Sequence, residues 1–131
     1  MRASQEENRD STSQERAIPA TFSHLTEGAF FARLAATAGV AVVVFSAPHC
    51  GACRAWKRLL PQALADMVDT FYEVDVSQAT GVARYFSIFH LPTVYLYRDG
   101  QFHAELQCEA RHDAIQQTAL QLLNAPAQDE P

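Results

Sequence analysis

Long apolar runs and basic residues are both scarce in this sequence. The longest apolar run, residues 40–45, is far too short to cross a bilayer, so we expect no transmembrane helix. Only 10 Lys and Arg stand against 15 Asp and Glu, which gives a formal net charge of -5. Nucleic acids and anionic membrane surfaces are bound through basic patches. We therefore expect neither nucleic acid nor membrane as a partner.

Cysteine is also scarce, with 3 residues in the chain of 131. This odd number does not suit a disulfide scaffold. The opening residues, MRASQEENRDSTSQER, are charged and rich in hydroxyls where a secretory signal needs an apolar segment, so we expect a cytoplasmic location. Structural disulfides are rare in a reducing compartment, and a C-x-x-C pair there indicates redox catalysis or metal binding.

The composition predicts one domain between two polar tails. Residues 1–18 are charged and lack periodicity, and residues 125–131 are rich in proline and acids, so both segments are predicted to be disordered. Residues 19–124 are long enough for a single domain with one core.

Strand and helix patterns alternate along this domain. Thr26 is expected to cap the first helix, and Asp99-Gly100 is a strong hairpin signal. The expected elements are a weak strand at 20–25, a helix to about 36, a strand at 40–47, a helix at 50–67, a strand at 70–76, a short helix at 80–89, a hairpin at 93–107 and a helix at 111–124. This order predicts an α/β fold whose central mixed sheet of four to five strands is flanked by helices on both faces.

The stretch SAPHCGACRAW places Cys50 and Cys53 where a buried strand runs into a helix. Free N–H groups and the dipole at a helix N-terminus favour a thiolate at Cys50, and a protonated His49 would add to this. Cys53 lies one turn further along the helix and is expected to be less accessible. Such a pair suits disulfide exchange, in which one thiol attacks and the other resolves the mixed disulfide.

With the segments around it, this pair resembles the thioredoxin family. The resemblance covers roughly residues 22–123 and rests on the apolar strand before CGAC, on FYEVDV and on HLPTVYLYRDGQ. It implies the thioredoxin fold, with Pro92 as a cis-proline beside the dithiol and Leu91 offering backbone groups to an extended substrate chain. The substrate-binding surface implied in this way consists of His49, Gly51, Ala52, Leu91, Pro92 and Thr93.

The resemblance also implies a function. The chain is expected to be a protein thiol–disulfide oxidoreductase acting in cell redox homeostasis, with Cys50 as the nucleophile and Cys53 as the resolving thiol. Its partners would be protein disulfides and a reductase or thiol pool that donates electrons. The sequence has neither a G-x-G-x-x-G motif nor a P-loop, so we expect no cofactor.

The chain departs from thioredoxin itself at positions that tune the thiols. Val44, six residues before Cys50, replaces a buried aspartate, and Phe71 stands at a position often taken by a lysine. The buried group that helps to deprotonate the resolving thiol is therefore expected to be missing.

Two other functions stay open for the cysteine pair. The missing acid favours a module that binds a client or partner with little or no redox turnover. A metal site would need further ligands from Cys108, His49 or His90, and we expect no metal. Cys108 itself is either a half-buried filler or a regulatory thiol.

Overall fold

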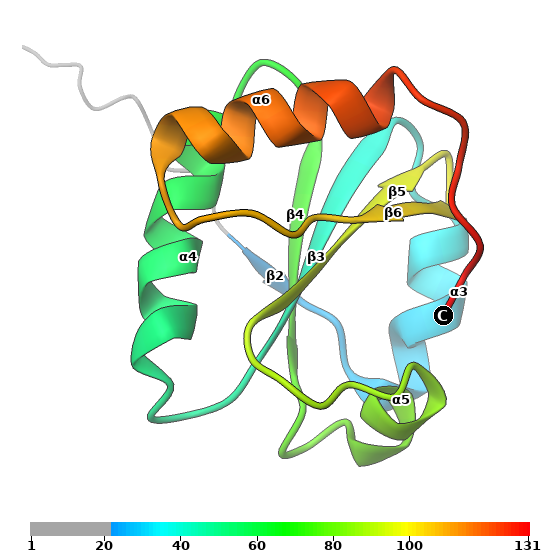
Figure 1. Cartoon of the computed structure of the whole chain (residues 1–131). Coiled ribbons are helices and arrows are strands. Elements are labelled where there is room, and N and C mark those ends of the chain that lie inside the picture. Colours follow the sequence, from blue (N-terminus) through cyan, green and yellow to red (C-terminus); the bar gives the residue numbers. More distant parts are fainter. Residues whose placement is uncertain (1–21) are drawn as a thin grey trace, which may run out of the picture.

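A five-stranded mixed sheet forms the centre of the computed structural model, which describes residues 22–131 (Figure 1). The expected N-terminal tail, residues 1–18, lies outside the described residues. In chain order the elements are β2 (Ser23–His24), the 3₁₀ helix η1 (Glu27–Ala29), α3 (Phe30–Ala35), β3 (Val40–Ser46), α4 (Gly51–Ala63), β4 (Thr70–Asp75), α5 (Thr80–Tyr85), β5 (Thr93–Arg98), β6 (Gln101–Glu105) and α6 (His112–Leu123).

The strands lie in the order β2-β4-β3-β5-β6. β4 pairs in parallel with β2 and β3, whereas β5 pairs in antiparallel fashion with β3 and β6. Helices cover both faces of this sheet (Figure 1). The predicted mixed α/β sheet with helices on both faces is confirmed.

Several predicted element ends were wrong. The strand expected at 20–25 is described from residue 22 on, where β2 takes Ser23–His24 and stops short of 25. The helix after the cysteine pair ends at Ala63 instead of near 67. The short helix expected to reach 89 stops at Tyr85, because Ser87 has a φ of 55°, a left-handed conformation that ends a helix. Thr26 stands at the N-cap of η1, but its side chain makes no capping hydrogen bond.

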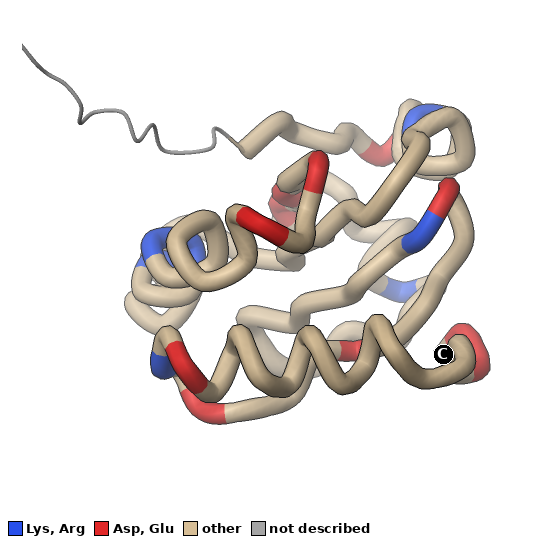
Figure 2. Tube along the Cα trace, turned by 90° about the horizontal axis from the view of Figure 1, so that it is seen from above, with Lys and Arg blue, Asp and Glu red and all other residues tan. Residues whose placement is uncertain are grey.

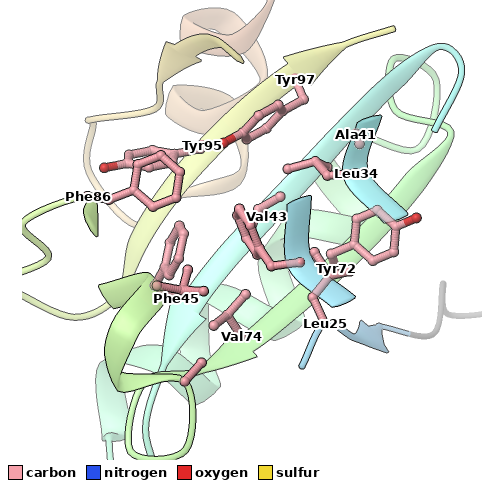
Figure 3. Close-up of a cluster of buried hydrophobic side chains, with 13 residues drawn as sticks. Leu25, Leu34, Ala41, Val43, Phe45, Tyr72, Val74, Phe86, Tyr95 and Tyr97 are labelled. Carbon is pink, nitrogen blue, oxygen red and sulfur yellow. The ribbon is translucent and has the colours of Figure 1, made fainter. Parts of the chain in front are cut away.

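Strand β3 is apolar at nearly every position because both of its faces are covered. Val42 and Val44 pack against α4 and α6. Val43 and Phe45 point to the other side, where they join a cluster with residues of α3 and α5 (Figure 3). Successive residues of β3 thus point to opposite faces of the sheet, as in any pleated strand, and each face is covered by a core. The carboxyl end of β3 is thereby held rigidly between two cores, and the cysteine pair follows it directly.

The turn between β5 and β6 lies at the end of the sheet opposite the cysteine pair. Asp99 and Gly100 have φ values of 51° and 82°, the two left-handed residues of a tight hairpin turn. Asp99 Oδ1 accepts a hydrogen bond of 2.8 Å from the backbone N–H of Gly39, just before β3. The hairpin is therefore tied to the start of the central strand.

The C-terminal residues, which the sequence predicts to be disordered, lie along the outer edge of β6 (Figure 1). The backbone N–H of Gln128 donates to the carbonyl of His103 at 2.7 Å. The side-chain oxygen of Gln128 accepts from the backbone N–H of Glu105 at 3.1 Å. The structure differs from the expectation because β6 is an edge strand whose free backbone groups offer these hydrogen bonds.

Among the described residues, no helix combines the length and apolar character that crossing a membrane requires.

Candidate active site

The two cysteines of the CGAC motif stand where β3 gives way to α4. Their sulfurs form a disulfide, and their Cα atoms are 5.2 Å apart. Cys50 is the N-cap of α4, and its Sγ accepts a hydrogen bond of 3.1 Å from the backbone N–H of Cys53. Cys50 therefore occupies the helix start that the sequence predicts, where N–H groups and the helix dipole stabilise a negative sulfur.

The two thiol positions differ in accessibility. Cys53 is 1% exposed, whereas Cys50 is partly exposed and His49, Gly51 and Ala52 around it are exposed. His49 has a φ of 66°, and this left-handed conformation turns the chain sharply out of the loop into the helix. An incoming disulfide can therefore reach Cys50 but not Cys53.

The helix that follows the pair is basic, although the whole chain is acidic. Arg54, Lys57 and Arg58 lie on α4, which has no acidic residue (Figure 2). Positive charges near a thiol favour its thiolate form. The charge of α4 is thus opposite in sign to the net charge of -5.

Leu91, Pro92 and Thr93 lie at the same end of the sheet as the cysteines. Thr93 begins β5 and pairs with Phe45 near the end of β3, so the segment before β5 and the turn after β3 meet there (Figure 1). The Leu91–Pro92 peptide bond is cis. Thr93 is buried and its hydroxyl donates to the carbonyl of His90 at 2.6 Å, while Leu91 and Pro92 are half-buried.

A pocket of about 400 Å³ extends from Leu91 towards α5. Its walls include Val76, Arg84, Ile88 and Phe89, and the Phe89 side chain is 88% exposed. The sequence favours the aromatic run of Tyr85, Phe86 and Phe89 as part of the core and of a groove wall. The structure divides the run, because Phe86 is buried in the core whereas Phe89 lines this pocket.

A carboxylate that sequence reasoning missed lies on the α4 side of the sheet. Val44 and Phe71, which stand where thioredoxin often has a buried aspartate and a lysine, are 0% and 5% exposed. However, the Glu73 side chain is only 13% exposed and forms an ion pair with Lys57. It also accepts a hydrogen bond of 2.8 Å from the Ser46 hydroxyl. The sequence predicts that this face of the sheet lacks a buried charged group, but Glu73 and Lys57 place an ion pair there.

Cys108 follows β6 and is half-buried against the core between the sheet, α4 and α6. Burial raises the pKa of its thiol, while a hydrogen bond with Thr118 and the charge of Arg111 lower it by less. The fraction of Cys108 that is ionised to the thiolate at neutral pH is therefore smaller than the fraction for a cysteine with the ordinary pKa.

We expect Cys108 to react more slowly with iodoacetamide in the native protein than in the unfolded chain at neutral pH, because alkylation needs the thiolate and access. The native rate should rise as the pH approaches the raised pKa. Mass spectrometry of a Cys50→Ser/Cys53→Ser variant gives both rates. Equal native and unfolded rates would show an available thiol and would favour the regulatory role.

Metal binding gains no support from the arrangement of side chains. Among residues 22–131, no group of three or more His, Cys, Asp or Glu is placed to hold a metal ion. Cys108, His49 and His90 are thus not gathered around the cysteine pair in the way that a metal site requires.

The family model described as Thioredoxin matches residues 21–121. A comparison with curated proteins finds no match. Among solved structures, the zinc-bound form of human ERp44 superposes with a TM-score of 0.63 at 22% identity, covering 77% of this chain and 32% of that one. Form I of human ERp44 gives a TM-score of 0.64 at 22% identity, covering 78% of this chain and 29% of that one. At this identity the likeness shows the fold alone, and this chain spans about a third or less of those proteins.

Proposed function

Because the chain belongs to the thioredoxin family, we propose that it is a protein thiol–disulfide oxidoreductase whose reacting groups are Cys50 and Cys53. The observation that carries this proposal is the geometry of the pair. An accessible Cys50 caps α4, and a buried Cys53 lies within bonding distance of it. Such a pair separates an attacking thiol from a resolving one.

In the reductive direction, the Cys50 thiolate attacks one sulfur of a target disulfide. The target S–S bond breaks, its second sulfur leaves as a thiolate, and a mixed disulfide with Cys50 forms. The Cys53 thiolate then attacks Cys50 Sγ and displaces the first target sulfur. The target gains two electrons and takes its protons from solvent, and the cycle ends in the Cys50–Cys53 disulfide seen in the structure. A reductase or a thiol pool would restore the dithiol.

The substrate would lie across the sheet end that holds Leu91 and Pro92. An extended target chain adding to the backbone of Leu91 would pass the exposed Cys50 side of the disulfide. Gly51 and Ala52 present little side-chain bulk there, and Thr93 fixes the loop through its bond to His90. We propose the cytoplasm as the compartment, because a dithiol must be kept reduced to attack target disulfides.

Insulin reduction tests this function. We expect the wild-type protein to accelerate the reduction of insulin disulfides by dithiothreitol, and Cys50→Ser to fall to the rate without protein, because the attacking thiolate is lost. Cys108→Ser is the matched control and should keep the wild-type rate. A wild-type protein that adds nothing to the dithiothreitol rate would instead support a binding module that uses the same fold without turnover.

A further inference from the structure

One charged cluster outside the dithiol is partly buried on the same side of the sheet as Cys53. Glu73 lies on β4, where Phe71 two residues earlier packs into the core under α4 and α6. Since side chains on a strand alternate, Glu73 faces α4 as well. In the sheet register Glu73 lies beside Val44 of β3, the strand that leads into the cysteine pair.

Two donors hold the Glu73 carboxylate. The Ser46 hydroxyl donates to Oε2 at 2.8 Å, and Lys57 Nζ donates to the same oxygen. Burial raises the pKa of Glu73, but the hydrogen bonds from Lys57 and Ser46 and the charges of Lys57 and His24 outweigh it and leave the pKa lowered. Glu73 is thus an anion at neutral pH, and it fixes the Lys57 ammonium against the sheet.

Lys57 lies one helical turn after Cys53. Residues four apart share one face of a helix, so both side chains are on the face of α4 that meets the sheet. Helical side chains lean towards the N-terminus, which brings the Lys57 side chain over the turn that contains Cys53. Cys53 is 1% exposed and the Lys57 side chain is 29% exposed, so both side chains lie largely away from solvent, where charges are screened less than at the surface.

The other cations near the cysteine pair are less well placed than Lys57 to stabilise a Cys53 thiolate. Arg54 and His49 are exposed beside Cys50, and His90 precedes the cis-proline in its loop. From the neighbouring strands, His24 of β2 contacts the cluster, with its Nε2 3.7 Å from Glu73 Oε1. Asp75 follows Glu73 on the same face of β4, and its carboxylate accepts hydrogen bonds from the backbone N–H and hydroxyl of Ser77. Among these groups, Lys57 is the cation that a contact holds on the buried side.

We propose that Lys57, anchored by Glu73 and Ser46, stabilises the thiolate of Cys53 and so acts as a positioning residue for the resolving step. The inference rests on the proposed function for its role in turnover. A buried thiol without a nearby cation resists ionisation, because burial disfavours the charged form. The ion pair therefore supplies, from α4 and β4, the charge that Val44 and Phe71 do not supply.

The test measures ionisation of Cys53 as the only cysteine, in a Cys50→Ser/Cys108→Ser parent. Thiolate absorbance in the ultraviolet, followed against pH, gives the midpoint. In Lys57→Met we expect this midpoint to rise by about one pH unit, the lower end of the effect of a nearby opposite charge. At a pH below both midpoints, this is roughly a tenfold loss of thiolate.

Arg58→Met is the matched control, because it removes the same charge from the next, exposed position of α4. Its midpoint should stay close to that of the parent. Lys57→Arg should also keep the parent midpoint, since it retains the cation. The inference would be overturned if Lys57→Met had the same midpoint as the parent, or if Arg58→Met shifted the midpoint as much as Lys57→Met. It would also be overturned if the midpoint of Lys57→Arg were as high as that of Lys57→Met.

Removing Lys57 leaves Glu73 without its cation, so folding is checked by circular dichroism. If Lys57→Met does not fold, Lys57→Met/Glu73→Gln removes both charges. Its midpoint should still rise, but by less than in Lys57→Met, because the Glu73 anion that also disfavours the thiolate is gone, and the absence of a rise there overturns the inference. The titration needs no target disulfide. A shifted midpoint in a protein that fails to reduce insulin would therefore refute the proposed function and still support the role of Lys57.

Discussion

Cys53→Ser is expected to leave Cys50 joined to its targets as mixed disulfides that outlast the reaction. The structure places Cys50 at the accessible start of α4 and Cys53 below it at 1% exposure, so the first attack survives the substitution and the resolving attack is lost. Insulin turnover should fall to the background rate. A non-reducing gel, run after the remaining thiols are alkylated, should show adducts that disappear on reduction, and mass spectrometry should map them to Cys50.

The matched control for this trap is Cys50→Ser/Cys53→Ser, which should form no adduct with the same targets. Cys53→Ser/Cys108→Ser should trap as much as Cys53→Ser, because Cys108 is half-buried and has a raised pKa. If the adducts mapped to Cys108, or if Cys53→Ser turned over insulin at the wild-type rate, the assignment of attacking and resolving thiols would be wrong.

Phe86→Ala is expected to cause the largest loss of stability among the substitutions considered. Phe86 is 2% exposed and lies at the centre of the aromatic cluster that joins α5 to the sheet (Figure 3). Its ring centroid is 5.6 Å from that of Phe30, 5.8 Å from Phe45 and 5.5 Å from Tyr95. Truncation loses this burial and leaves a cavity, which costs about 3–5 kcal/mol.

This loss is a large part of the roughly 5–15 kcal/mol by which native domains are stable. Urea unfolding of the oxidised proteins measures it. Phe89→Ala is the matched control, because Phe89 comes three residues later but is 88% exposed, and its truncation should change the free energy of unfolding by no more than about 0.5 kcal/mol. Similar losses in both variants would contradict the position of Phe86 in the core.

The sequence by itself determined the elements and groups whose signals are local. An apolar strand running into CGAC predicted the dithiol at a helix start, because strand and helix periodicities change there within a few residues. Asp99-Gly100 predicted the hairpin, since both residues adopt the left-handed conformation that a tight turn demands. Helix ends were less predictable: a serine at position 87 has no strong preference for the left-handed conformation that ends α5.

Only the tertiary structure decided which distant side chains meet. Glu73 lies 27 residues from Ser46 and 16 from Lys57, and no sequence spacing connects the three. The parallel register of β4 on β3 and the packing of α4 over both strands bring them together. The edge of β6, likewise, gives the C-terminal residues backbone partners that their polar sequence does not reveal. Local preference sets where the thiols stand, whereas strand register and helix packing set the charges around them.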